Sequence, residues 1–256
     1  MPLTDLVLLV GLFFATSVVG VVTGSNSLIT VPLMFQFGID EKVAVATNMF
    51  GLTFMAIGGT IPFLRQGSIE INKLTPLVVL TIVGSAIGAT LVGLITNQSI
   101  RIIVSIAMVA IILFTIFRGN SRRENAAGDD SAIGTHPRLY FLVFPATFLL
   151  AIYGGLYSGG YVTVLTAVLV AFSGRTYAES IAATKFINVF SSGIATLLFM
   201  WQGLVDYQLG IILGVAMFFG AFLGAHFASR MNESLLRAIF ISAAAILAVK
   251  VLVDLF

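Results

Sequence analysis

Apolar residues run along the chain in long stretches that short polar segments separate. The hydrocarbon core of a bilayer is about 30 Å thick, so a helix needs roughly 20 apolar residues to cross it. Seven stretches are close to that length: Leu3–Val22, Val43–Leu64, Leu74–Ile95, Ile100–Phe117, Tyr177–Trp201, Leu209–Ala228 and Leu235–Leu255. Three are shorter: Leu28–Phe37, Leu139–Ile152 and Val162–Phe172. The pattern predicts an all-α polytopic membrane protein of ten helical segments, or about eight full spans.

Two stretches interrupt the apolar pattern where a helix would otherwise continue. Gly20–Pro32 reads G-V-V-T-G-S-N-S-L-I-T-V-P, and Gly154–Tyr161 reads G-G-L-Y-S-G-G-Y. In lipid, a helix breaks only where protein or a water-lined cavity satisfies the exposed backbone groups. Paired interruptions in two halves of a chain indicate the binding site of a transporter. We therefore expect a polar pocket at membrane depth between the two breaks.

The two halves of the chain resemble each other at an offset of 136 residues. The offset superposes glycines, a glutamine and an arginine: Gly38 on Gly174, Gln66 on Gln202, Gly67 on Gly203, Gly84 on Gly220, Gly88 on Gly224 and Arg101 on Arg237. The stretch Arg118–Arg138 is the one strongly polar segment, and its composition cannot build a core. We therefore expect one transmembrane repeat at 1–117, a cytoplasmic linker at 118–138 and a second repeat at 139–256.

The distribution of basic residues favours an inverted repeat over a parallel one. Loops on the cytoplasmic side of membrane proteins carry an excess of Lys and Arg. With the linker in the cytoplasm, an inverted arrangement places nine basic residues inside and two outside, whereas a parallel arrangement gives six and five. The nine are Arg65, Lys73, Arg118, Arg122, Arg123, Arg138, Arg175, Arg230 and Arg237, and the two are Lys42 and Arg101. Both termini are then predicted to lie outside.

The composition excludes several other classes of protein. Hydrophobic residues make up 59% of the chain and charged residues 9%, and the mean hydropathy is +1.08, whereas soluble domains carry about 25% charged residues. The chain has no cysteine, so thiolate metal sites are absent. It also lacks the H-E-x-x-H and G-x-x-x-x-G-K motifs of metalloproteases and nucleotide-binding enzymes. We expect neither enzyme activity nor a cofactor, and we expect no binding of nucleic acid.

One basic residue is predicted to lie near the membrane midplane. Lys185 follows the polar turn at Ser173 by twelve residues, which is about 18 Å of helix. An ammonium group at this depth is costly, so it indicates a functional site or a paired charge. With the register slipped by one residue from the offset of 136, so that Ala46–Thr47 superposes on Ala183–Thr184, Lys185 corresponds to Asn48. Thr47–Asn48 and Thr184–Lys185 therefore bring polar groups to the middle from both halves.

The predicted site has the properties of an anion site. A helix that starts at each break points its N-terminal N–H groups and the positive end of its dipole inward. Serine, asparagine and tyrosine side chains at the breaks add hydrogen-bond donors, and no acidic residue is predicted at the same depth. The candidate residues are Ser25, Asn26, Ser27, Thr47, Asn48, Tyr157, Ser158, Gly159, Gly160, Thr184, Lys185 and Asn188.

Structural roles for these residues stay open at this stage. Asn48 and Asn188 can join helices by hydrogen bonds, and Ser25 and Ser27 can cap a short helix. Lys185 can bind carbonyl groups that a helix break exposes. Glycines spaced four apart, at 84/88 and 220/224, are typical of close helix packing.

These residues resemble the sulfite exporter TauE/SafE family of bacterial membrane proteins. In the first half, the resemblance rests on the Gly20–Pro32 stretch and on A-T-N at 46–48, R-Q-G at 65–67 and G-x-x-x-G-A at 84–89. In the second half it rests on Y-G-G-L-Y-S-G-G at 153–160 and A-T-K at 183–185. The chain departs from the family at Gly24–Ser27, where G-S-N-S replaces a glycine-rich segment.

The resemblance implies a multi-pass protein of the bacterial inner membrane that moves sulfite or organosulfonate anions, often outward. Together with the residues, it predicts an alternating-access transporter with a central anion site. A proton or sodium ion is a candidate coupling ion. An anion channel and a membrane accessory protein without transport activity are the alternatives.

Overall fold

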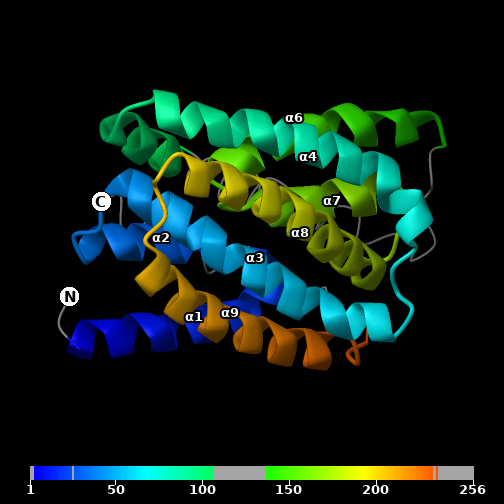
Figure 1. The fold of residues 1–256 in the computed structure, drawn as a ribbon. Helices are drawn as coiled ribbons and strands as arrows, with labels where there is room; N and C mark the ends of the chain where they lie inside the picture. Colours follow the sequence, from blue (N-terminus) through cyan, green and yellow to red (C-terminus); the bar gives the residue numbers. More distant parts are fainter. Residues whose placement is uncertain (1–2, 25, 107–136, 233–234, 236–256) are drawn as a thin grey trace.

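The computed structural model describes residues 3–24, 26–106, 137–232 and 235, and these residues are helical apart from short connections (Figure 1). The first half contains α1 (Leu3–Thr23), α2 (Asn26–Gln36), α3 (Glu41–Arg65), α4 (Ile71–Leu94) and a helix at 97–106. The second half contains a 3-10 helix (Pro137–Leu142), α6 (Val143–Leu156), α7 (Tyr161–Phe172), α8 (Tyr177–Trp201) and α9 (Tyr207–Ala228). Among the described residues, five helices are long and apolar enough to cross a membrane: α1, α3, α4, α8 and α9.

The predicted segments are confirmed wherever the structure describes them, with changes at their ends. The break in the second half is shorter than predicted, because Gly154 and Gly155 belong to α6, which ends at Leu156. Thr47 and Asn48 do not interrupt the helix that contains them, since α3 is continuous from Glu41 to Arg65. The predicted helices beyond residue 106 and beyond residue 235, and the linker up to residue 136, lie outside the described residues.

The long helices form three layers. Figure 1 shows α1 and α9 along the bottom, α4 and α6 along the top, and α3 and α8 between them. Most residues in the apolar stretches of α3 and α8 are buried, 72% and 61%, against 39% in α1 and 44% in α4 and α9. The two central helices, α3 and α8, pack on each other and carry Asn48 and Lys185.

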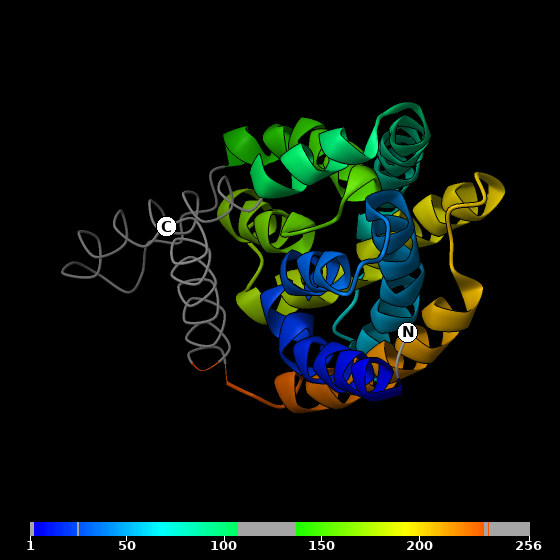
Figure 2. The same cartoon turned by 90° about the vertical axis from the view of Figure 1, so that its left-hand side faces the viewer.

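The two halves of the sequence interleave. The most extensive contacts of α9, from the second half, are with α3 and α1 of the first half. In the same way α4, from the first half, packs on α6 and α8 of the second half. The short helices α2 and α7 lie beside these layers, as the end-on view shows (Figure 2).

Small residues allow the two helices of each outer layer to approach each other closely. A Cβ atom on Gly88 of α4 would lie 1.9 Å from the Ile152 carbonyl oxygen of α6. A Cβ atom on Gly224 of α9 would lie 2.2 Å from the Val18 carbonyl oxygen of α1. The structure therefore confirms that these glycine pairs serve helix packing.

Candidate functional site

The two helix breaks lie against each other in the centre of the molecule. The Thr163 hydroxyl of α7 donates a hydrogen bond to the Thr23 carbonyl at the end of α1, at 2.7 Å. The Tyr157 hydroxyl donates to the Ser27 carbonyl at the start of α2, at 3.1 Å. A side chain on Gly24 would collide with the Thr163 amide nitrogen, at 2.7 Å. The breaks thus satisfy part of each other's exposed backbone, as the membrane interior requires.

Left-handed backbone conformations make each break tight. Gly24 follows α1 with a φ of +73°, and Gly160 precedes α7 with a φ of +76°. Ser158 has a φ of +68°, which non-glycine residues rarely adopt. Ser25 lies outside the described residues.

A small cavity lies between the two breaks and the two central helices. Its volume is about 10 Å³, which is room for about one water molecule. Polar groups reach it from three segments: Asn26 and Ser27 of α2, Ser158 of the second break, and Lys185 and Asn188 of α8. The rest of the lining is apolar or glycine: Gly20, Gly24, Leu52, Met55, Ala56 and Val162.

Lys185 brings a buried ammonium group to this cavity. The residue is 2% exposed, and its Nζ donates a hydrogen bond to the Gly20 carbonyl oxygen at 3.1 Å. The same carbonyl accepts the Gly24 N–H at 2.8 Å. Within the described part of the chain, no carboxylate forms an ion pair with Lys185. An ammonium can donate three hydrogen bonds, so this geometry leaves it capacity for a ligand.

Two amide side chains in the cavity wall have polar atoms without a partner among the described residues. These atoms are Nδ2 and Oδ1 of Asn26 and Oδ1 of Asn188. Both residues are buried, 3% and 4% exposed. A buried amide without a partner costs about 1–3 kcal/mol, so a ligand or water that bonds these atoms would recover stability.

The other predicted site residues lie nearby but hold the structure together. Asn48 accepts from the Thr30 hydroxyl at 2.7 Å and donates to the Ser27 hydroxyl at 3.0 Å, which joins α3 to α2. Thr47 accepts from the Asp206 N–H, and the Thr184 hydroxyl bonds the Thr166 hydroxyl.

The remaining predicted residues shape the second break itself. The Gly159 carbonyl accepts the Tyr153 hydroxyl, and the absence of a side chain on Gly159 leaves room for the Tyr157 ring. Gly160 is the N-cap of α7. The structure therefore brings Asn26, Ser27, Ser158, Lys185 and Asn188 to the cavity, and the other described candidates support them.

The apolar wall of the cavity and the Gly20 carbonyl were not among the residues predicted from the sequence. Leu52, Met55 and Ala56 of α3 follow Asn48 at intervals of four, seven and eight residues, so they lie on the same helical face. That periodicity could have identified them. The acceptor role of Gly20 depends on the position of Lys185 in space, which no sequence pattern specifies.

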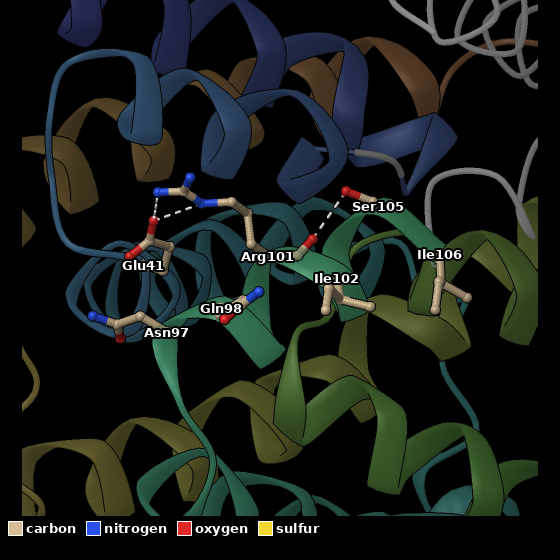
Figure 3. Close-up of a pocket in the computed structure, with 7 residues that line it drawn as sticks. All are labelled: Glu41, Asn97, Gln98, Arg101, Ile102, Ser105 and Ile106. Atoms are coloured by element: carbon tan, nitrogen blue, oxygen red, sulfur yellow. Dashed lines mark hydrogen bonds and ion pairs between the residues drawn. The ribbon is translucent and has the colours of Figure 1, made fainter.

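A second hollow lies between the start of α3 and the helix at 97–106. It has a volume of about 610 Å³ and is lined by Glu41, Asn97, Gln98, Arg101, Ile102, Ser105 and Ile106 (Figure 3). Arg101 Nε donates to the Glu41 carboxylate at 2.8 Å, and the terminal nitrogen Nη2 of Arg101 donates to the same oxygen. The guanidinium is thus paired, and its contact joins the start of α3 to the helix at 97–106. Among the described residues, no group of three His, Asp or Glu side chains could hold a metal ion.

Comparisons with known proteins agree with this architecture. The sequence profile of the sulfite exporter TauE/SafE family matches residues 8–251. The chain is 25% identical to probable membrane transporter protein ORF9 of Sinorhizobium sp over 252 residues, covering 96% of this chain and 93% of the relative. It is 26% identical to probable membrane transporter protein YfcA of Escherichia coli K12 over 248 residues, covering 95% and 89%.

A third relative shows similar coverage. The chain is 23% identical to probable membrane transporter protein YdhB of Bacillus subtilis over 222 residues, covering 86% of this chain and 89% of the relative. No solved structure matches the chain. The profile match covers nearly the whole chain and describes a family of transporters rather than enzymes, so this multi-pass membrane protein belongs to the sulfite exporter TauE/SafE family.

Proposed function

We propose that the protein carries sulfite or an organosulfonate anion across the bacterial inner membrane, in the outward direction, by alternating access. One observation carries the proposal. Lys185 places a buried ammonium in a cavity between two helix breaks, beside amide groups that lack partners. The name of the family supplies the class of anion.

The charge of the cavity favours an anion over a cation. Among the described residues, the polar lining consists of one lysine, two asparagines and two serines, with no carboxylate. The first turns of α2 and α7 begin at this place, so their N–H groups and dipoles add positive potential. A sulfonate or sulfite group presents three oxygens, which match several converging donors.

The small volume of the cavity sets a condition on transport. A cavity of about 10 Å³ accommodates about one water molecule, whereas sulfite has four heavy atoms. The anion therefore enters only when the breaks or the central helices separate. The Lys185–Gly20 hydrogen bond is a contact that an entering anion would replace, and it links α8 to α1 across the site.

Two features support a structural repeat as the basis of alternating access, and the distribution of basic residues favours its inverted form. Left-handed glycines recur at the offset of 136: Gly24 and Gly160, Gly38 and Gly174, and Gly67 and Gly203. The helix contacts also exchange between halves, since α1 packs on α9 as α6 packs on α4, and α3 packs on α9 as α8 packs on α4. In this arrangement both termini lie outside and the linker at 118–138 lies in the cytoplasm.

A polar stripe on α8 supports a route through the protein. Seven buried polar residues follow this helix over 17 residues: Ser180, Thr184, Lys185, Asn188, Ser191, Ser192 and Thr196. That distance is about 24 Å, close to the thickness of the hydrocarbon core. Polar residues inside a membrane mark substrate pathways.

The test is binding of sulfite, sulfoacetate, thiosulfate and chloride to the purified protein, measured as a ligand-dependent rise in the midpoint of thermal unfolding. A ligand that binds the native state alone raises stability by RT ln(1 + [L]/Kd). We expect a rise with a sulfur anion that is lost in Lys185→Met and kept in Lys73→Met, an exposed lysine of α4. Equal shifts in wild type and Lys185→Met would overturn the proposed site. Saturable counter-flow of the anion in proteoliposomes distinguishes a transporter from a channel.

A further inference from the structure

A second group of buried oxygen atoms lies where α4, α6, α7 and α8 meet. The Ser85 hydroxyl of α4 is 2.7 Å from the Ser191 hydroxyl of α8 and donates to the Ala151 carbonyl of α6 at 3.1 Å. The Tyr161 hydroxyl of α7 faces the hydroxyls of Thr81 and Ser191 without completing a hydrogen bond to either. These five oxygens, from Thr81, Ser85, Ala151, Tyr161 and Ser191, are called the oxygen cluster below.

The oxygen cluster is fully enclosed and incompletely bonded. The side chains of Thr81, Ser85 and Tyr161 are 0% exposed, and that of Ser191 is 1% exposed. The hydroxyl oxygens of Thr81 and Tyr161 have no hydrogen-bond partner among the described residues. A buried polar atom without a partner calls for an explanation such as an ion or a water molecule.

The chemistry of the oxygen cluster differs from that of the Lys185 cavity. All five groups are neutral oxygens, and hydroxyls and carbonyls are ligands that hard cations prefer. Ala151 lies five residues before the end of α6 (Val143–Leu156), and its carbonyl oxygen accepts the Ser85 hydroxyl in addition to its place in the helix. In transporters with broken helices, carbonyls and C-terminal helix ends bind the coupling cation, while N-terminal ends bind the anion.

The other half of the molecule shows that packing alone does not require these hydroxyls. At the offset of 136, apolar residues take their places: Met217 for Thr81, Ala221 for Ser85 and Met55 for Ser191. Met217 and Ala221 are 0% exposed and Met55 is 3% exposed. A buried interface at these positions can therefore be built from apolar side chains.

We propose that the oxygen cluster binds a sodium ion whose movement is coupled to that of the anion. The proposal rests on the proposed function and adds a coupling ion to it. Ser191 follows Asn188 by one turn on α8, and Asn188 lines the anion cavity. The two sites thus share one helix, so a shift of α8 changes both. An ion at this cluster would complete the bonding of Thr81 and Tyr161.

The first measurement is thermal unfolding without a sulfur anion, in sodium chloride or choline chloride of equal concentration, so that chloride is the same in both. We expect sodium to raise the midpoint in wild type, and we expect Ser85→Ala to abolish the rise. Ser17→Ala is the matched control, because Ser17 is a buried hydroxyl without a partner in the described region of the α1–α9 interface. The second measurement is sodium-driven anion flux in proteoliposomes, which should fall about tenfold or more in Ser85→Ala.

Three outcomes would overturn the sodium site. Sodium and choline could give the same midpoint in wild type, the sodium effect could survive in Ser85→Ala and Thr81→Val, or Ser17→Ala could abolish it as well. If Ser85→Ala fails to fold, the sodium effect is measured in Thr81→Val, and its survival there overturns the site. Anion-dependent stabilisation that persists without any sodium effect would leave the proposed function standing, and the oxygen cluster would then hold water.

Discussion

At the scale of single residues, the backbone of Ser158 is an unusual feature of the cavity. Its φ of +68° is left-handed, although its neighbours Gly159 and Gly160 show that glycine is accepted in this segment. A left-handed conformation costs a residue with a Cβ about 1–2 kcal/mol. Such strain points to a role for the side chain, and the Ser158 residue lines the cavity beside Lys185.

Replacing Ser158 with glycine should separate stability from binding. Glycine adopts this φ without steric cost, so the free energy of unfolding should stay unchanged or rise by up to about 1 kcal/mol. The ligand-dependent rise in unfolding midpoint should shrink because a hydroxyl leaves the cavity wall. Thermal unfolding with and without the anion measures both effects. Full ligand stabilisation in Ser158→Gly would show that the hydroxyl has no part in binding.

The two buried asparagines of the first half should respond differently to the same substitution. In Asn26→Leu, the unpaired amide disappears, so stability should stay the same or rise by about 1 kcal/mol, while ligand stabilisation is lost. In Asn48→Leu, the bonds to Thr30 and Ser27 disappear, which should lower stability by about 1–3 kcal/mol. Chemical unfolding in detergent compares them. A loss of stability in Asn26→Leu as large as in Asn48→Leu would contradict a ligand-binding role for Asn26.

At the scale of helices, local sequence signals fixed some boundaries and misplaced others. The range predicted for α8, Tyr177–Trp201, agrees with the structure, and its start has a capping box of Thr176 and Glu179. Gly154 and Gly155 looked like part of a break but lie inside α6. Gly155 makes room for the Ser85 backbone of α4, and Gly154 makes room for the Tyr161 ring. A glycine that permits close approach and one that ends a helix look alike in sequence.

The same limit applies to the candidate site. The sequence located both breaks and the buried Lys185, because polar residues stand out among apolar neighbours. It could not separate Asn26, which lines the cavity, from Asn48, which joins α2 to α3. Both are amides at similar depth, and their roles depend on which partners the packing of other helices supplies.

The close packing of α4 on α6 gives a prediction at this scale. In Gly88→Ala, the new Cβ would lie 1.9 Å from the Ile152 carbonyl oxygen, so backbone must move and stability should fall by about 3 kcal/mol. Gly193→Ala is the control within a helix, since no atom of the described residues lies within 4 Å of its Cβ position. The control should gain roughly 0.5–1 kcal/mol from helix propensity. Unfolding midpoints measure both, and equal stability of the two variants would refute the packing role of Gly88.

At the scale of the whole molecule, the two sequence repeats do not form two separately packed units. Each outer layer combines a helix of one half with a helix of the other, α1 with α9 and α4 with α6. A motion that separated residues 1–117 from 139–256 would break the glycine contacts of both layers. We therefore expect the moving bodies to be α1, α3 and α9 on one side and α4, α6 and α8 on the other.

The contact between these two bodies is the place to test that expectation. The Thr53 hydroxyl of α3 and the Thr196 hydroxyl of α8 are 3.0 Å apart, so sulfur atoms in their places would be about 1 Å from the S–S bond length of about 2.0 Å. The chain has no cysteine, so Thr53→Cys with Thr196→Cys introduces the sole pair. Oxidation should stop anion flux in proteoliposomes, because the bodies can no longer separate, and reduction should restore it.

The single variants Thr53→Cys and Thr196→Cys control for the loss of the hydroxyls and should transport with or without oxidant. Binding distinguishes a locked transporter from a damaged one. The Lys185 cavity is about 10 Å³ in this arrangement, so the oxidised pair should also lose ligand-dependent stabilisation while keeping its unfolding midpoint. If the oxidised pair transports at the rate of wild type, the α3–α8 contact stays closed during the cycle. Access to Lys185 would then come from movement of α2 and α7 at the breaks.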